Sequence, residues 1–164
     1  MSPREVKGPE PPKVSFAVDA ERTVSGLLTM PKGARALYVL AHGAGAGMTH
    51  PFMAAVSAML AERGIATLRY QFPYMERGSR RPDTPAIAEA TVRAAVAEGR
   101  ALAPRLPLFA GGKSFGGRMT SQAEAHGALG VAGLAFLGFP LHPPGAPGDK
   151  RGDHLAAVKV PLLF

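Results

Sequence analysis

Apolar residues along this chain of 164 residues gather in short uninterrupted runs that glycine, proline or polar residues bound. Four of these runs are Ala36–Ala41, Ile65–Tyr70, Leu106–Gly111 and Val131–Phe139, and a fifth begins at Val160. Apolar runs of this length are typical of strands that are covered on both faces. We therefore predict that they form a mostly parallel β-sheet.

Helical periodicity fills the gaps between these runs. The first predicted helix can be capped by Thr49 and stopped by Gly64. Its apolar face would consist of Phe52, Val56, Met59 and Leu60. A longer helix opens at Thr84-Pro85, and one face of it carries Ala88, Val92, Ala95, Gly99 and Leu102. A third predicted helix runs to about His126.

The beginning of the chain has a different pattern. Val14–Val18 and Val24–Met30 are strand-like, and the turn-like residues 19–22 between them predict an antiparallel hairpin. Residues 1–13 are polar and proline-rich, and we expect a disordered lead-in there. Residues 14–164 are then expected to form one domain, because the length suits a single core.

Strands that alternate with helices predict the α/β class, with a doubly wound, mostly parallel sheet and helices on both faces. Sites in such sheets form at the carboxyl ends of strands. His42, Phe72, Ser114 and His142 each follow a predicted strand. We expect these four residues to share one edge of the sheet.

Composition narrows the class of protein. The chain has no cysteine, which excludes disulfides and thiolate catalysis, and we predict a cytoplasmic protein, of bacterial origin by its abundant Ala, Gly, Pro and Arg. It has no apolar run long enough to cross a membrane and no secretory signal pattern at its start. The formal net charge is +7, but the basic residues are scattered, so a nucleic-acid partner is not expected.

The most informative stretch is Gly112-Lys113-Ser114-Phe115-Gly116, where a predicted strand turns into a predicted helix. This is the setting of a nucleophile elbow, in which a strained turn presents a serine hydroxyl above the strand end. Side chains two residues before and after Ser114 would collide, and glycine at both places avoids that. The alternative is a glycine-rich turn whose serine merely caps the helix.

A second constellation follows the run Ala36–Ala41 and reads His42-Gly43-Ala44-Gly45. A tetrahedral intermediate needs two N–H donors aimed at its oxyanion, and we expect the amides of Ala44 and Phe115 to supply them. The alternative is a flexible loop or a phosphate cradle. The spacing fits no P-loop, and Met48 stands where a dinucleotide fingerprint would need glycine.

Together, the two motifs resemble the alpha/beta-hydrolase superfamily. The strings Lys113–Met119 and Gly138–Gly145 are similar to a narrower group near the dienelactone hydrolases. This group includes the alpha/beta-hydrolase-like domain of subunit 3 of the nonspecific-lethal histone acetyltransferase complex and its testis-expressed relative. The resemblance covers roughly residues 14–164. It implies a serine hydrolase that acts on small esters or related acyl compounds without a metal or organic cofactor.

The resemblance also implies a triad acid and a histidine that follow the serine in chain order. The acid normally follows the strand that begins at Val160, so we expect a fold cut before its C-terminal strand and helix. Histidines after Ser114 are His126, His142 and His154, and of these His142 is the stronger candidate for a substitute base. The residues expected to line the substrate pocket are His42, Gly43, Tyr70 and His142.

Two readings of function stay open at this point. The intact elbow favours a serine hydrolase, whereas the absent triad partners favour a catalytically silent interaction or scaffold protein, or an inactive fragment. A sheet without its last strand would expose an edge and apolar surface, so a homodimer is expected on that ground.

Overall fold

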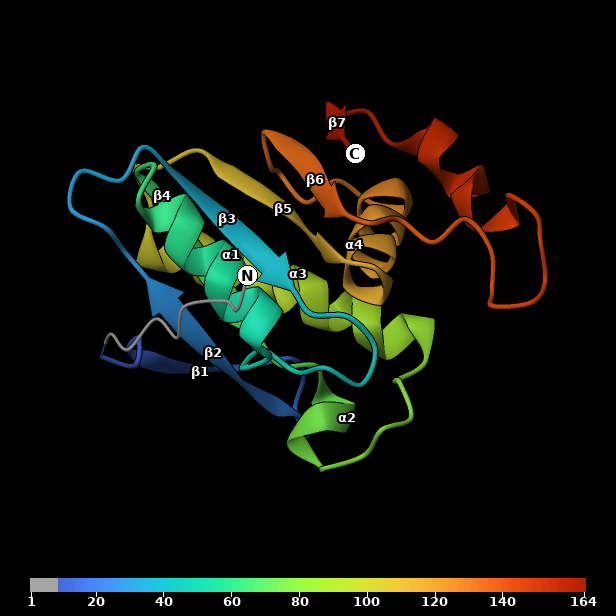
Figure 1. Ribbon diagram of the computed structural model, residues 1–164, viewed down its shortest axis with the longest axis horizontal. Helices are drawn as coiled ribbons and strands as arrows, with labels where there is room; N and C mark the ends of the chain where they lie inside the picture. Colours follow the sequence, from blue (N-terminus) through green and yellow to red (C-terminus); the bar gives the residue numbers. More distant parts are fainter. Residues whose placement is uncertain (1–8) are drawn as a thin grey trace, which may run out of the picture.

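The computed structural model describes residues 9–164, and every strand in that part belongs to one seven-stranded sheet (Figure 1). The strands lie in the order β1-β2-β4-β3-β5-β6-β7. Strands β1 (Lys13–Ala17) and β2 (Thr23–Thr29) form an antiparallel hairpin, and β2 pairs antiparallel with β4 (Ile65–Tyr70). All other pairs are parallel, so the predicted fold class and the predicted hairpin are confirmed.

The remaining strands are β3 (Ala36–Ala41), β5 (Leu108–Lys113), β6 (Gly133–Leu137) and β7 (Leu162–Leu163). Strands β5 and β6 differ from the predicted boundaries. The β5 strand continues through Gly111 and Gly112 because both glycines pair with neighbouring strands, and β6 is shorter than the apolar run that contains it. The expected disordered lead-in covers residues 1–8, which lie outside the described residues, and residues 9–13, of which Lys13 already belongs to β1.

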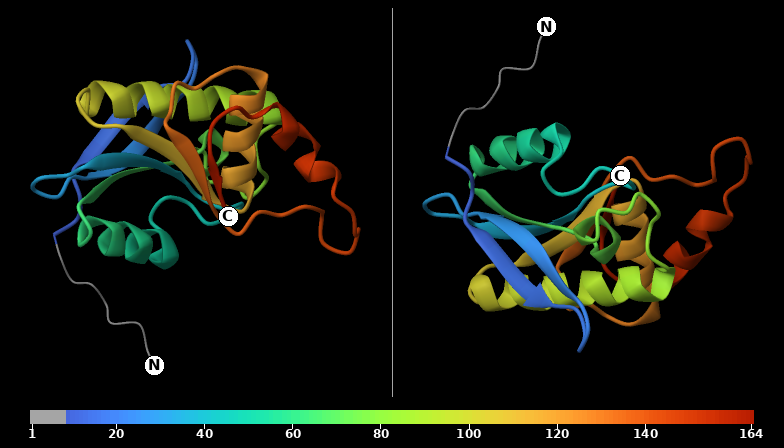
Figure 2. Two further views of the ribbon diagram at one scale, coloured as in Figure 1. Left: turned by 90° about the horizontal axis from the view of Figure 1, so that it is seen from above. Right: turned by 90° about the horizontal axis from the view of Figure 1, so that it is seen from below.

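Helices cover both faces of the sheet (Figure 2). Helix α1 (Pro51–Ala61) packs on one face, while α3 (Pro85–Leu102) and α4 (Phe115–His126) pack side by side on the other. Two short elements were not predicted, namely α2 (Pro73–Glu76) and the 3₁₀ helix η1 (Lys150–Ala157), which packs on α4. Both are too short to show a clear apolar period.

Helix α1 corrects two predictions. Its N-cap is His50 rather than Thr49, and the His50 side chain accepts a hydrogen bond from the Phe52 N–H at 3.1 Å. Its buried residues are Met53 and Ser57, whereas Phe52 and Met59 are exposed. Val56 and Leu60 of the predicted face do pack against the sheet. The other half of the face was misplaced because α1 is apolar nearly all round, so periodicity alone did not show which side meets the sheet.

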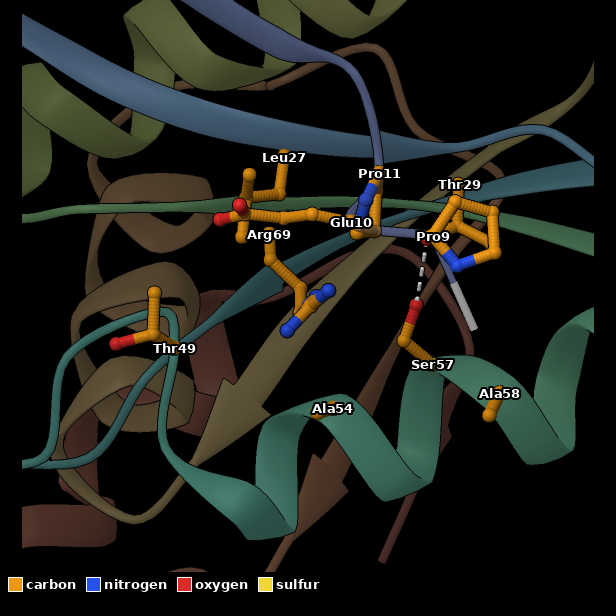
Figure 3. Close-up of a pocket in the computed structure, with 10 residues that line it drawn as sticks. All are labelled: Pro9, Glu10, Pro11, Leu27, Thr29, Thr49, Ala54, Ser57, Ala58 and Arg69. Atoms are coloured by element: carbon orange, nitrogen blue, oxygen red, sulfur yellow. Dashed lines mark hydrogen bonds between the residues drawn. The ribbon is translucent and has the colours of Figure 1, made fainter. Parts of the chain in front are cut away.

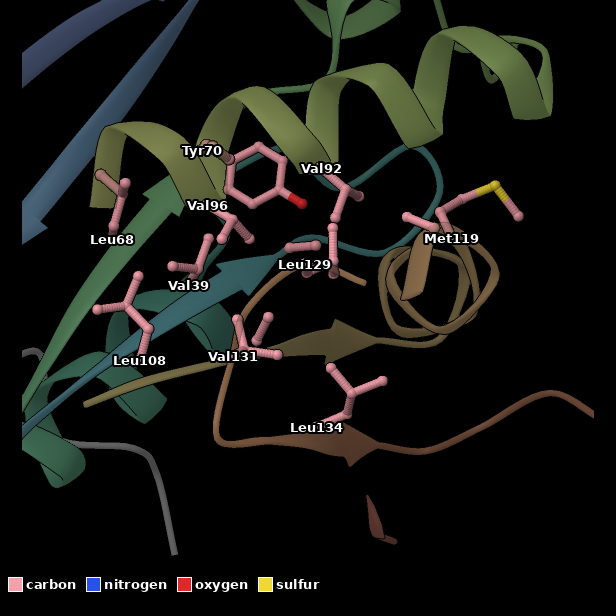
Figure 4. Close-up of a cluster of buried hydrophobic side chains, with 14 of the residues drawn as sticks. Val39, Leu68, Tyr70, Val92, Val96, Leu108, Met119, Leu129, Val131 and Leu134 are labelled. Atoms are coloured by element: carbon pink, nitrogen blue, oxygen red, sulfur yellow. The ribbon is translucent and has the colours of Figure 1, made fainter. Parts of the chain in front are cut away.

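The main core lies between the sheet and the pair α3 and α4 (Figure 4). Val92 and Val96 of α3 lie over Val39 and Tyr70 of the sheet. A smaller apolar cluster around Tyr38, Leu40 and Met53 lies under α1. The two clusters fix the sheet from both sides and hold the carboxyl ends of β3, β4, β5 and β6 at one edge.

Candidate active site

Ser114 stands at the turn between β5 and α4 in a strained backbone conformation. Its φ is 50° and its ψ is −113°, and no other non-glycine residue in 9–164 has a positive φ. Such a conformation is unfavourable for a residue with a Cβ and persists only where the surroundings enforce it. The Ser114 N–H donates to the Gly138 carbonyl at 3.0 Å, which ties the turn to the end of β6. Ser114 is the N-cap residue of α4 by position, but its side chain makes no capping hydrogen bond.

Two glycines allow the backbone around Ser114 to come close to β3. A Cβ atom at Gly112 would lie 2.2 Å from the carbonyl oxygen of Ala41, and one at Gly116 would lie 2.4 Å from that of His42. Real Cβ atoms do not approach carbonyl oxygens so closely. The predicted need for glycine two residues before and after Ser114 is therefore confirmed.

Two backbone N–H groups beside Ser114 are free to bind a ligand. Phe115 is the first residue of α4, so its N–H has no acceptor within the helix. Ala44 lies in the loop after β3, and neither N–H donates to a protein acceptor within residues 9–164. Ala44, Ser114 and Phe115 line the same cavity. The loop around Ala44 is held by the Gly45 N–H, which donates to the Tyr74 hydroxyl at 2.9 Å.

Ser114 lies between two cavities at this edge of the sheet. One of about 280 Å³ extends towards the start of α1 and is lined by Gly43, Ala44, Ala46, His50, Phe52, Met53 and Lys113. The other, of about 480 Å³, extends towards the loop after β6 and is lined by Ala44, Pro82, Asp83, Pro85, Phe115, Arg118, Pro140, His142, Pro144 and Arg151. The hydroxyl-bearing turn, the free N–H groups and the cavities together form a candidate active site.

A family profile described as "Alpha/beta hydrolase domain" matches residues 34–164, which include the whole of this site. The chain belongs to the alpha/beta-hydrolase family. That it lies near the dienelactone hydrolases within this family stays a prediction of the sequence. The narrower resemblance to the nonspecific-lethal complex subunit stays a prediction.

Several solved structures share this fold. The dienelactone hydrolase of Anabaena variabilis has a TM-score of 0.75 and 23% identity over 93% of this chain and 72% of that one. A serine hydrolase without a lid from Xanthomonas campestris has a TM-score of 0.69 and 19% identity over 94% and 68%. Est1E from Butyrivibrio proteoclasticus has a TM-score of 0.63 and 21% identity over 75% of this chain, which spans 49% of Est1E. No curated protein matches the sequence.

His42 supports the site of this hydrolase domain instead of lining it. Its side chain is fully buried, and its Nε2 accepts a hydrogen bond from the Phe72 N–H at 3.1 Å. Nδ1 therefore carries the proton and donates to the Gly43 carbonyl at 2.7 Å. Burial lowers the pKa of His42 to about 4, although the bond to Gly43 acts in the opposite direction. His42 thus stays neutral and fixes the beginning of the loop that carries Ala44.

Tyr70 is a correction to the predicted pocket. Its side chain is fully buried between the sheet and α3, and it lines neither cavity beside Ser114 (Figure 4). The reason is its place at the last position of β4, where its ring faces the main core against Phe16 and Phe72. Gly43 lines the smaller cavity and His142 lines the larger one.

The histidines that follow Ser114 in the hydrolase domain have separate partners. Nδ1 of His126 is 2.9 Å from Glu89 on α3, and Nε2 of His154 is 2.7 Å from the Ser121 hydroxyl on α4. His142 is exposed, and its Nδ1 donates to the Pro143 carbonyl at 2.9 Å, which leaves Nε2 as an acceptor. None of the three forms a hydrogen bond with Ser114 within residues 9–164.

Sequence reasoning missed several residues of the cavities, namely His50, Lys113, Arg118, Asp83 and Arg151. One signal was present for Arg118, which lies one helical turn after Ser114 and therefore on the same side of α4. The Nζ of Lys113 lies 5.0 Å from the centre of the Phe52 ring, and both residues line the smaller cavity. No signal of similar strength marked the others.

Charges in the larger cavity are mostly basic. The carboxylate of Asp83 is already used, because it accepts from the Tyr74 N–H at 3.0 Å and from Arg77 at 3.1 Å. Arg118 and Arg151 have no carboxylate partner in the described part of the chain. Partial burial lowers the pKa of Arg118, and the neighbouring charge of Arg151 acts in the same direction.

Two further findings concern cofactors and membranes. Within residues 9–164, no three His, Asp or Glu side chains come together in a way that would bind a metal ion. In the same residues, no helix combines the length and the apolar character that crossing a bilayer requires.

Proposed function

We propose that this domain is a serine hydrolase that acts on small esters or related acyl compounds through Ser114. The observation that carries the proposal is the strained backbone of Ser114. It holds the serine side chain between two cavities, and that side chain makes no capping hydrogen bond. Strain of this kind is retained at sites where it positions a reactive group.

The arrangement suggests how an acyl group would be transferred. The Ser114 Oγ would attack the carbonyl carbon of the ester, and its proton would pass to a base. The carbonyl oxygen would then gain negative charge and accept hydrogen bonds from the Ala44 and Phe115 N–H groups. Phe115 also stands at the amino end of α4, where the helix dipole favours negative charge. Collapse of the intermediate would expel the alcohol, and water would release the acid from Ser114.

The mechanism also needs a base that takes the proton from the Ser114 hydroxyl. Two histidines line the cavities beside Ser114, namely His50 and His142. His50 uses its Nδ1 lone pair to accept from the Phe52 N–H, so it caps α1. His142 keeps Nε2 free while Nδ1 is bonded to a carbonyl, which is the protonation pattern that a general base needs. We therefore assign the base to His142 within this chain.

The cavities suggest the size and charge of the substrate. Volumes of about 280 and 480 Å³ suit small ligands. Arg118 and Arg151 would favour an acyl or alcohol portion with negative charge.

A second candidate function is a catalytically silent alpha/beta-hydrolase-like interaction domain. The observation that favours it is that no histidine forms a hydrogen bond with Ser114 within residues 9–164. A serine hydroxyl without a base is a weak nucleophile.

Labelling with a fluorophosphonate probe separates the two functions. Intact mass would be measured before and after reaction for the wild type, Ser114→Ala and Ser121→Ala. Ser121 is the matched control because it already has a histidine at hydrogen-bond distance but is fully buried. We expect one adduct on the wild type and on Ser121→Ala, and none on Ser114→Ala. A wild type that stays unlabelled while folded would favour the interaction domain.

A further inference from the structure

A separate cavity of about 370 Å³ lies on the α1 side of the sheet (Figure 3). It is an open cavity bounded by the segment 9–11, the loop before α1, strands β2 and β4, and helix α1. Its lining residues are Pro9, Glu10, Pro11, Leu27, Thr29, Thr49, Ala54, Ser57, Ala58 and Arg69. None of them lines either cavity beside Ser114, so this space is distinct from the candidate active site.

Arg69 brings a buried cation to this cavity. Its side chain is only 4% exposed, and Figure 3 shows its guanidinium group pointing from β4 towards Ala54 on α1. One nitrogen, Nη1, donates to the Met48 carbonyl at 3.1 Å. The Nε–H is buried and has no acceptor within residues 9–164, nor does Arg69 form an ion pair there. A buried guanidinium with an unused donor is costly unless an anion accompanies it.

Hydroxyl groups also lie near Arg69. In the sheet, Leu27 pairs with Arg69 and Thr29 pairs with Thr67, so all four residues lie on the face towards α1. The Ser57 hydroxyl of α1 donates to the Thr29 hydroxyl at 3.0 Å. Thr49, in the loop before α1, lines the same cavity, but its hydroxyl points away from the guanidinium (Figure 3). Guanidinium and hydroxyl donors are the groups that bind phosphate and carboxylate.

The cavity lining contains one acidic residue, Glu10, on the segment before β1. Its charge acts to raise the pKa of Arg69, but burial has the larger effect and lowers it. Glu10 is exposed and forms no ion pair with Arg69 among the described residues. The position next to the Arg69 guanidinium is therefore available to another anion.

We propose that this cavity binds a small oxyanion, phosphate or carboxylate, on the Arg69 guanidinium, with the Thr29 hydroxyl as a further donor. The site is independent of acyl transfer at Ser114. Its volume admits a small metabolite that carries one such group.

Binding would be measured on the full chain by calorimetry and thermal unfolding, with inorganic phosphate and malonate as probes in separate arms. Sodium chloride at matched ionic strength controls for screening. We expect saturable binding of at least one probe and a rise in Tm of about 3 to 6 °C at a tenfold excess over Kd. Arg69→Gln should weaken that binding about tenfold or more.

Phosphate also stabilises proteins without binding them, because it is excluded from their surface. Two variants of helix α1 distinguish this effect from binding in the cavity. Ala54→Glu places a carboxylate in the cavity from α1, whereas Ala55→Glu adds the same charge at an exposed position outside it. We expect Ala54→Glu to abolish saturable binding and to raise the Tm without added anion. Ala55→Glu should do neither. The absence of saturable binding to the wild type, or equal responses of both variants, would overturn the proposal, even where Arg69→Gln does not fold.

Discussion

The carbonyl oxygen of His42 occupies the space that a side chain at Gly116 would need, because a Cβ atom there would lie 2.4 Å from it. Alanine is intrinsically better than glycine in a helix by about 1 kcal/mol. The carbonyl belongs to the backbone after β3 and cannot move aside cheaply. We therefore expect Gly116→Ala to lower the free energy of unfolding by about 1 to 3 kcal/mol, measured by urea denaturation.

Gly152→Ala is the matched control for that substitution. The nearest atom to a Cβ at Gly152 is the Cδ2 of Leu141 at 3.1 Å, the end of an exposed side chain that can rotate. We expect a change within about 0.5 kcal/mol. Equal effects at the two positions would show that the approach of α4 to β3 is looser than described.

A second prediction concerns the hydroxyl of Tyr74, which accepts from the Gly45 N–H in the loop that carries Ala44. The Tyr38 hydroxyl donates to the Ala135 carbonyl at 2.7 Å, away from that loop. Tyr74→Phe and Tyr38→Phe should each cost about 1 kcal/mol of stability. Faster hydrogen exchange at the Gly45 amide and slower fluorophosphonate labelling of Ser114 are expected for Tyr74→Phe alone. If both variants label like the wild type, the Tyr74 hydroxyl does not position the loop.

The domain should become less stable as the pH falls, because His42 is buried in its neutral form. Burial lowers the pKa of His42 from 6.5 to about 4, so the unfolded chain binds the proton more tightly than the folded one. The stabilisation is present above pH 6.5 and is lost as the pH falls towards 4, by about 3 kcal/mol at most. Urea denaturation at several pH values would measure this loss.

His42→Gln separates this effect from that of other groups. Glutamine can both donate and accept a hydrogen bond but does not titrate. The variant should lose less stability between pH 6.5 and 4 than the wild type does, whatever its stability at pH 7. An unchanged pH dependence would mean that His42 is not the group responsible.

Substitutions at two histidines test whether His142 is the base. His142→Ala should slow labelling of Ser114 about 100-fold or more, because a general base typically contributes that much. His154→Ala should leave the rate unchanged, since His154 is bonded to Ser121 on α4. Labelling that survives in His142→Ala would place the base elsewhere and contradict this part of the mechanism.

Self-association is expected at the β7 side of the sheet. Leu163 and Phe164 are exposed by 69% and 68%, and Phe109 on β5 is also partly exposed. Sedimentation velocity should show a concentration-dependent dimer that Leu163→Lys weakens. A wild type that stays monomeric at all concentrations would rule this out.

Local sequence signals predicted much of the fold and the centre of the site. The elbow could be found because the strain at Ser114 and the close approaches at Gly112 and Gly116 each demand a particular residue type at a fixed spacing. The parallel strands could be found because burial on both faces leaves continuous apolar runs.

Side-chain direction was the part that the sequence did not reveal. Arg69 and Tyr70 are neighbours on β4, yet the first faces α1 and a separate cavity while the second is buried under α3. Which face of a strand meets which helix depends on the packing of the whole sheet. The cavity residue Asp83 comes from the loop before α3, and Arg151 comes from the short 3₁₀ helix η1. The positions of both segments depend on long-range contacts and leave no periodic signal.

The strand order also has a consequence for synthesis of the chain. Strand β3 lies between β4, which follows it closely, and β5, which begins at Leu108. A ribosome would thus complete the hairpin, β3 and β4 well before β5 emerges. During that interval one edge of the apolar strand Ala36–Ala41 has no partner and is open to other chains. Translation speed and chaperone access over residues 42–113 are therefore expected to decide how much of this protein folds in a cell.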